Sequence, residues 1–452
     1  MAPSRRLRLR RTVSRSRLVR AWQDCYWLVV GVLVAFGVVS MGRPFLGRHG
    51  YGPPLPHNDS VILEYVGWFL AQGNTLYTDI WEIKPPLAFA PTYAFAHLTG
   101  SNMYLHHLLG IATTTAALAA TAAFTARIVG TVTESPEAGA AAGIAFFALP
   151  DLFYLPWLGY KAKIMVFAFG LAALDRAVRG DHFESGVLAG LSVGFWQLAL
   201  VFPAVTTLYA ARTKSWANVR RHVLGGALAL AAILATLVLY ADAGGFLAEV
   251  VLGPVVLETE QAPFDPKAYL AFFPGSTGGW LTLAGLSGLA VAFLDSEEPT
   301  ARPLAVGGLL VLGVLFVDFD GLWDTVYPLV FTAVGVGVLV SHLSRRAQVA
   351  AVVVLVLLVT PAFAPSEFIR QDPVDTKPSD GLPPAIDAER ESVYWNHRPI
   401  ESCRFFGAGT QRSLLQYYPN ADVLAEAPCG ELDLYWAVTR QRLFGSDAPP
   451  PR

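Results

Sequence analysis

Long apolar blocks separated by short polar segments fill most of the first 364 residues. Clear examples are residues 26–41, 222–240, 304–317 and 349–359. Blocks of this kind approach the roughly 20 residues that cross a hydrocarbon core of about 30 Å. They need no amphipathic period, because lipid is apolar on every side. The pattern therefore predicts an all-α polytopic membrane protein.

The placement of arginines predicts how these blocks are oriented. Arginines crowd residues 5–20, ahead of the first block, and Arg-rich flanks of this kind stay in the cytoplasm. No small-residue cleavage site follows, so we expect an uncleaved first helix rather than a removed signal peptide. The predicted divisions are a cytoplasmic N-terminus (1–21), a transmembrane domain (22–364) with external loops at 42–101 and 241–278, and an external C-terminal tail domain (365–452).

One block does not fit a simple alternation of crossings. A single passage through residues 185–211 would place Arg212 and Arg220 outside, against the positive-inside rule. The block is long and contains several glycines and Pro203, which suits a broken-helix hairpin that enters and returns on one side. Residues 138–157, by contrast, are expected to form one outgoing helix. The expected total is about nine full spans plus this hairpin.

Composition agrees with a membrane protein. Of the 452 residues, 54% are hydrophobic and only 15% are charged, well below the roughly one quarter found in soluble domains. The sequence contains no nucleic-acid-binding motif, so no such partner is expected. The tail has the pattern of a small α/β unit. If it is external, Cys403 and Cys429 form a candidate disulfide, and two unpaired thiols are the alternative.

The segment directly after the first span carries the candidate chemistry. Residues 59–71 place apolar side chains along one helical stripe while Ser60 and Glu64 fall elsewhere. This arrangement predicts an amphipathic helix lying on the membrane surface. Asp59 stands at its start, within an Asn-Asp-Ser sequence that is also a common helix cap.

A Lys-Pro-Pro-Leu element follows at residues 84–87, where the prolines hold Lys84 extended and open a second amphipathic helix. Together with Asp59 it resembles the GT-C superfamily of polyprenyl-phosphate-sugar glycosyltransferases, in its protein O-mannosyltransferase and aminoarabinose-transferase branch. Many members have an acidic residue directly after that Asp, where this chain has Ser60. The lysine-poor, Ala/Val/Arg-rich spans are typical of haloarchaeal proteins, and among these the resemblance is to the dolichol-phosphate-mannose mannosyltransferases of N-glycosylation.

The resemblance implies an inverting enzyme that moves a sugar, expected to be mannose, from dolichyl phosphate to a lipid- or protein-linked glycan at the external face of the cell membrane. In that mechanism Asp59 is the general base for the acceptor hydroxyl. Lys84 stabilises the departing phosphate. The alternatives are that Asp59 is only a helix cap and that Lys84 is only a snorkelling interfacial lysine.

Further residues are candidates for the same site. Lys161 and Lys163 sit with Tyr160 at the expected outer ends of two spans, against the positive-inside rule, where they bind the donor phosphate or simply anchor the interface. Glu82 is expected either to serve the site, by orienting Lys84 or by contacting acceptor hydroxyls, or to be a solvated loop carboxylate, which is the commoner case for a loop carboxylate. No His/Cys/Asp spacing matches a metal site, so neither a metal nor a cofactor is expected.

Other function classes remain open at the level of sequence. Many spans with a Gly/Pro-broken hairpin are also found in secondary transporters, although those place ionisable groups near the bilayer midplane. A scaffold whose tail binds a partner is a third class. Within the enzymes, a protein O-mannosyltransferase differs from a glycan-extending enzyme only in its acceptor.

Overall fold

The structure is a computed structural model, and it describes residues 17–48, 59–78, 82–100, 103–252, 277–294, 301–315 and 326–359. Within these residues the fold is helical, apart from an isolated parallel bridge between Leu76 and Ala241. The longer helices are α1 (Arg17–Arg48), α2 (Asp59–Ala71), α3 (Ala90–Thr99), α4 (Met103–Val132), α5 (Pro136–Ala145), α6 (Ala162–Arg179), α7 (His182–Phe195), α8 (Val201–Arg212), α9 (Trp216–Tyr240), α13 (Thr277–Leu294), α14 (Arg302–Leu315), α15 (Val326–Ser341) and α16 (Arg345–Val359). The shorter ones are η1 (Pro86–Phe89), η2 (Phe146–Ala148), η3 (Pro150–Phe153), η4 (Leu155–Leu158), η5 (Gln197–Leu200), α10 (Ala243–Phe246) and the π-helix η6 (Leu247–Leu252).

The all-helical prediction is confirmed, whereas the number of spans stays a prediction. Among the described residues, two helical stretches are long and apolar enough to cross a membrane, Leu105–Val132 and Trp216–Tyr240. Shorter apolar stretches include Asp24–Ser40, Gly279–Leu294 and Val326–Ser341. The predicted tail with Cys403 and Cys429 lies outside the described residues, as do the first 16 residues and most of the 241–278 loop.

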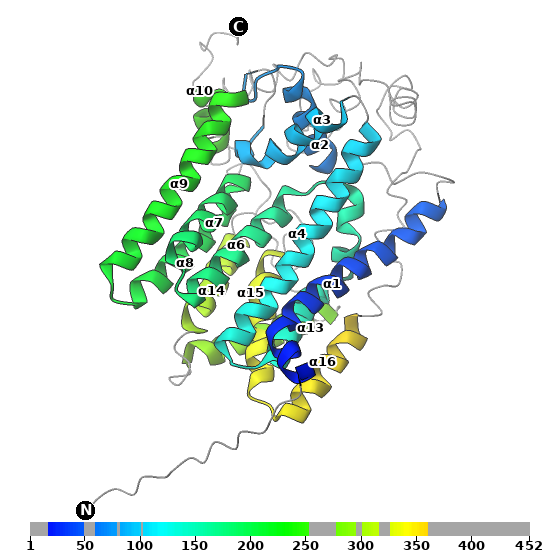
Figure 1. The fold of residues 1–452 in the computed structure, drawn as a ribbon, viewed down its shortest axis with the longest axis vertical. Helices are drawn as coiled ribbons and strands as arrows, with labels where there is room; N and C mark the ends of the chain where they lie inside the picture. The colour runs from blue at the N-terminus through cyan, green and yellow to red at the C-terminus, as the bar shows by residue number, and fades with distance from the viewer. Residues whose placement is uncertain are drawn as a thin grey trace, which may run out of the picture.

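Several peripheral helices present apolar faces that no described part of the protein covers. Phe36 of α1, Val238 of α9 and Leu357 of α16 are 69%, 88% and 62% exposed. Figure 1 shows these three helices on the outside of the bundle. Apolar faces of this extent match a lipid solvent rather than water.

Inside the bundle, small residues let helices approach closely. A Cβ added at Gly285 of α13 would overlap the backbone of Thr332 in α15, and one at Gly335 of α15 would overlap the carbonyl of Gly285. Close backbone contact at small residues is the usual mode of helix packing in an apolar solvent, where no hydrophobic force drives helices together.

The expected single helix over residues 138–157 is wrong. Helix α5 ends at Ala145, and the 3₁₀ turns η2, η3 and η4 follow it. Phe147 has non-helical torsion angles, and prolines stand at positions 150 and 156. Because proline lacks an amide N–H and clashes with the preceding turn, the α-helix does not continue through this segment.

The expected break in the 185–211 block lies between α7 and α8. Trp196 is extended (φ −164°, ψ 135°), so α7 ends before it and η5 begins after it. Near the beginning of α9, His222 packs against Gly186 at the start of α7 and lies 3.4 Å from Thr206 of α8. Both ends of the α7–α8 pair therefore lie at the same end of the bundle, while the side of the membrane they face stays a prediction.

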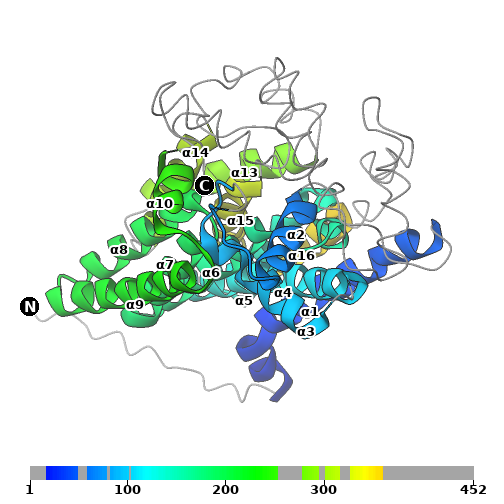
Figure 2. The same ribbon diagram turned by 90° about the horizontal axis from the view of Figure 1, so that it is seen from above.

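The segment after α2 joins the other end of the bundle, where α9 finishes. The N–H of Leu76 donates to the carbonyl of Tyr240 at 2.8 Å, and the N–H of Asp242 donates to Leu76 at 3.0 Å. Figures 1 and 2 show α2, α3 and α10 gathered at this end with the beginning of α4. The fold thus brings the two predicted loop helices together with elements more than 100 residues away.

Candidate active site

Lys84 forms a buried ion pair with Glu82. Its Nζ lies 3.1 Å from Oε1 of Glu82, and the side chains are only 10% and 6% exposed. The same oxygen accepts the backbone N–H groups of Ile83 and Lys84, at 3.0 and 3.3 Å. Of the two alternatives for Glu82, the solvated carboxylate is wrong, because this carboxylate folds back on its own loop. The loop is extended at Pro85 (φ −60°, ψ 153°), and η1 starts at Pro86 as expected.

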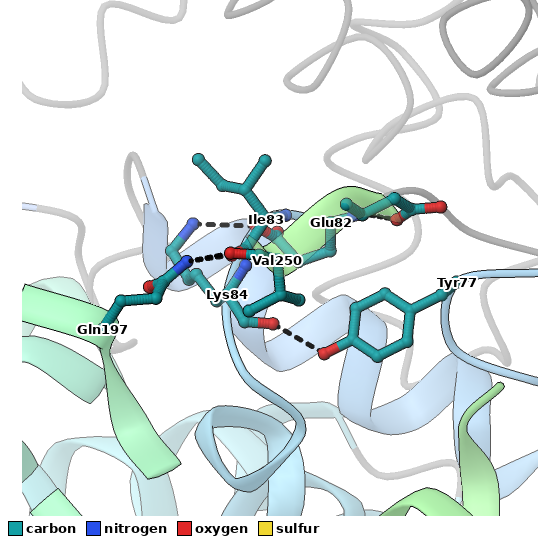
Figure 3. Close-up of polar contacts among 7 residues, drawn as sticks. Tyr77, Glu82, Ile83, Lys84, Gln197 and Val250 are labelled. Carbon is teal, nitrogen blue, oxygen red and sulfur yellow. Dashed lines mark hydrogen bonds and ion pairs between the residues drawn. The ribbon is translucent and has the colours of Figure 1, made fainter. Parts of the chain in front are cut away.

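Three side chains from outside the loop hold it by its carbonyl groups. Tyr77 donates its hydroxyl to the Lys84 carbonyl at 2.7 Å, and Tyr240 donates to the Pro86 carbonyl at 2.8 Å. Gln197 donates its amide to the Ile83 carbonyl at 2.6 Å. Figure 3 shows Gln197 and Tyr77 reaching the loop from opposite sides. The position of the Lys84 ammonium is therefore set before any ligand binds, which is the condition for strong electrostatic stabilisation.

The ring of Trp196 contacts two lysines, Lys84 and Lys163. The Nζ atoms of Lys84 and Lys163 lie 5.5 and 5.1 Å from the centroid of its ring. Lys163 also lies 5.0 Å from the ring of Tyr327. Aromatic faces attract cations by about 0.5–2 kcal/mol, so the Trp196 ring favours both ammonium groups in their charged form. Sequence reasoning predicted both lysines but missed Trp196, whose only signal is its place at the helix break.

Lys161 occupies the N-cap of α6, next to Lys163. Its backbone N–H donates to Oγ1 of Thr114 at 3.0 Å, and the residue is buried. Tyr160 is wholly buried, with its ring edge-on to Phe95 at 6.5 Å. Tyr160 therefore contributes packing and a backbone N–H at this end of the bundle.

Glu249 is a carboxyl group of this region that sequence reasoning missed. It belongs to η6, is 1% exposed, and accepts the Glu82 N–H at 2.9 Å. Burial raises the pKa of Glu249 to about 9, and the nearby charges of Glu82 and Asp242 act in the same direction. The group is thus neutral at neutral pH. The signal available from sequence was a single carboxylate inside the apolar run 247–252.

Asp59 is the first residue of α2, at the position expected for the candidate base. The structure does not describe its side chain, so its role stays a prediction. The orientation of α2 differs from the surface helix that was expected, because its polar positions Ser60 and Glu64 are fully buried. The polar side of α2 faces the protein interior, because a polar side chain of another helix pairs with it there.

That partner is His107 of α4. Its Nδ1 lies 3.1 and 3.0 Å from Oε1 and Oε2 of Glu64, and the backbone N–H of Tyr160 donates to Oε1 at 2.9 Å. Burial by itself would raise the pKa of Glu64, but His107, His106 and the Tyr160 N–H together bring it below its ordinary value. Glu64 is therefore an ionised buried carboxylate.

In the part of the chain that the structure describes, no group of three or more His, Cys, Asp or Glu side chains could hold a metal ion. The prediction that the site needs no metal or cofactor remains a prediction. The lysines and carboxylates of this region are suited to binding an anion and to proton transfer.

Comparisons with known proteins indicate the class of enzyme. Residues 73–237 match the family model described as DolP-mannose mannosyltransferase, a range that contains Lys84, Lys161, Lys163 and Trp196. The dolichol phosphate-mannose mannosyltransferase of Haloferax volcanii is 27% identical over 317 residues, which are 68% of each chain.

The fold is similar to that of ArnT from Cupriavidus metallidurans, whose crystal structure contains bound undecaprenyl phosphate. The TM-score is 0.51 at 15% identity, over 94% of this chain and 78% of ArnT. These matches favour the enzyme over the transporter and scaffold alternatives. The chain is a glycosyltransferase that is similar to the DolP-mannose mannosyltransferases, and its helical fold is similar to that of ArnT.

Proposed function

We propose that the enzyme transfers mannose from dolichyl phosphate to an acceptor glycan at the external membrane face, with inversion at the anomeric carbon. The observation that carries this proposal is the buried Lys84, which pairs with Glu82 and shares the ring of Trp196 with Lys163. Two ammonium groups that contact the same aromatic ring suit the phosphate of a lipid-linked donor.

The reaction begins when an acceptor hydroxyl oxygen attacks the anomeric carbon of mannose. The new C–O bond forms as the bond from that carbon to the phosphate oxygen breaks, and the electron pair leaves with the phosphate. Asp59 takes the hydroxyl proton as general base, a role worth about 10²–10⁴-fold. The products are the mannosylated acceptor and dolichyl phosphate.

The charges of the site favour the transition state over the bound donor. The phosphate gains negative charge as it departs, so fixed ammonium groups stabilise it more at that moment than before. Glu249 contributes no opposing charge, because its raised pKa keeps it protonated at neutral pH. Glu82 offsets one of the lysine charges, but it fixes the direction of Lys84 in return.

The external location rests on the Arg-rich N-terminus, which places the end of α1 that leads into α2 outside. The donor is then bound from the membrane through its dolichyl chain. An acceptor glycan, either lipid-linked or attached to protein, reaches the same end from outside.

The test compares purified wild-type protein with Asp59→Asn in transfer of labelled mannose from dolichyl phosphate to a lipid-linked glycan. Asparagine keeps the capping capacity of the residue but cannot accept a proton, so transfer should fall by about 10²–10⁴-fold. Asp242→Asn is the matched control, because Asp242 caps α10 by accepting the Gly245 N–H at 2.6 Å. This control should transfer at the wild-type rate.

Equal activity of Asp59→Asn and Asp242→Asn would leave Asp59 as a cap and defeat the proposed mechanism. The anomeric configuration of the product, compared with that of the donor, tests the inversion separately. Wild-type transfer to a peptide hydroxyl rather than to a glycan would replace the proposed acceptor.

A further inference from the structure

One buried carboxylate, that of Glu64, joins three separate segments at the active-site end. It belongs to α2, it pairs with His107 of α4 at 3.0 Å, and it accepts the N–H of Tyr160 at 2.9 Å. Its side chain is fully buried. Figures 1 and 2 both show α2 beside the beginning of α4.

The chain leaves room for this carboxylate at two glycines. A Cβ added at Gly110 of α4 or at Gly159 would overlap Oε1 of Glu64. Gly159 also has φ +112°, a backbone conformation that L side chains rarely adopt. Burying a charge costs several kcal/mol unless it is paired and hydrogen-bonded, so this geometry has to be well satisfied to persist.

The segment that follows Gly159 is held at successive positions. Thr114 donates its hydroxyl to the Gly159 carbonyl and accepts the N–H of Lys161, both at 3.0 Å. Between these two residues, the N–H of Tyr160 is bound by Glu64. The backbone that leads into Lys161 is therefore fixed directly to α2 and α4.

Glu64 thus connects the helix of the proposed general base to the segment of the proposed phosphate-binding lysines. Asp59, the proposed base, begins the helix that carries Glu64. Lys161 and Lys163, the proposed phosphate ligands, follow the N–H that Glu64 binds. In an inverting displacement the base and the departing phosphate lie on opposite sides of the anomeric carbon, so their separation decides whether the reacting atoms are aligned.

We propose that Glu64 is a positioning residue that, with His107, sets the distance between Asp59 and the phosphate-binding lysines. This inference rests on the proposed function and assigns to Glu64 no contact with the substrate. Misplacement of reacting groups by about 1 Å costs on the order of 10²-fold in rate. Loss of Glu64 should therefore lower kcat, while the lysines still bind the donor.

The test uses purified full-length protein and Glu64→Gln, with Glu64→Ala as a second variant. Glutamine keeps an acceptor for the Tyr160 N–H and removes the charge, whereas alanine removes both. The amount of dolichyl phosphate bound at saturation gives the fraction of protein molecules that can bind the donor lipid, which we call competent molecules. The kcat is then expressed per competent molecule, and the donor KM and the thermal midpoint are measured on the same samples.

Asp175→Asn is the matched control. Asp175 is also 1% exposed and paired with arginines, Arg127 at 3.4 Å and Arg179 at 3.1 Å, but it lies at the far end of α6 from Lys161. A purely structural carboxylate should lower the thermal midpoint and the competent fraction, with kcat per competent molecule within about 2-fold of wild type.

For Glu64→Gln we expect kcat per competent molecule to fall at least about 10-fold and the donor KM to stay within about 3-fold, with a larger fall in kcat for Glu64→Ala. A wild-type kcat per competent molecule in both variants would overturn the inference while the proposed function stood. Absence of mannose transfer by the wild type, or full activity of Asp59→Asn, would overturn both together.

Discussion

The side-chain amide of Gln197 donates to the carbonyl oxygen of Ile83 at 2.6 Å, although 114 residues separate the two in the chain. The same amide lies 3.2 Å from the carbonyl of Val250, next to Glu249. The break between α7 and α8 therefore holds the residue directly before Lys84. This contact joins the helical hairpin directly to the candidate active site.

Replacing Gln197 by leucine should weaken donor binding. The change removes both hydrogen bonds and leaves partly buried carbonyl groups without donors, at about 1–3 kcal/mol each. We expect the donor KM to rise about 10-fold. Gln348→Leu is the control, because Gln348 likewise donates to two carbonyl groups, those of Ser341 and Leu343, and does so at another site. If both variants changed KM equally, the effect would be one of general stability.

Replacing Lys84 by methionine should separate its charge from its packing. Methionine keeps the apolar stem, so transfer should fall by about 10²–10³-fold through loss of the charge alone. The thermal midpoint should fall as well, because Glu82 is left buried without its cation. In the double variant Lys84→Met/Glu82→Gln the thermal midpoint should recover and the activity should not. Recovery of both would mean that Lys84 serves only to neutralise Glu82.

The raised pKa of Glu249 predicts how stability depends on pH. Below the ordinary pKa of 4.5 the group is protonated in both the folded and the unfolded state. From there to about 9 the folded protein holds a proton that the unfolded chain has released, so stability falls as pH rises, by up to about 1.4 kcal/mol per pH unit. Glu249→Gln lacks this dependence.

The thermal midpoint of Glu249→Gln should therefore exceed that of the wild type by a margin that grows from pH 5 to pH 9. The exposed Glu184 offers a control in Glu184→Gln, which should show no growing margin. A constant margin for Glu249→Gln across this range would contradict the prediction.

Gly159→Ala should lower both stability and activity. A Cβ there meets Oε1 of Glu64 and forces an alanine into φ +112°. Gly180 has a positive φ of +87° but open space around it, so Gly180→Ala carries only the backbone strain, of order 1–3 kcal/mol. A larger fall in thermal midpoint and in kcat for Gly159→Ala than for Gly180→Ala would measure the crowding of Glu64. Equal effects in the two variants would show that the Glu64 carboxylate moves aside at little cost in free energy.

Reporter fusions test the predicted topology. A cytoplasmic reporter after Ser215, between α8 and α9, should be active, because both ends of the hairpin are expected inside. A reporter that requires an external location should be active after Pro450. An external Ser215 would refute the hairpin interpretation, and an internal Pro450 would refute the external tail.

The sequence by itself indicated most of the helical elements of the described residues and the resemblance to the glycosyltransferases. Apolar blocks of membrane length favour helices, since lipid leaves the backbone few other ways to satisfy its hydrogen bonds, although prolines broke the block over residues 138–157. The Asn-Asp-Ser cap placed the beginning of α2 at Asp59, and the prolines after Lys84 placed η1 at Pro86. Both signals act over one turn of helix, which is why a linear pattern reveals them.

Only the tertiary structure decided which side of α2 faces the protein and which distant groups meet there. Glu64 is an ordinary polar position along its helix until His107 and Tyr160 are packed against it. In the same way, Gln197, Trp196 and Glu249 reach the Lys84 loop through contacts between segments far apart in the chain. Such contacts depend on the angles at which helices cross and on the effect of burial on a charged group. Local periodicity in the sequence predicts neither of these.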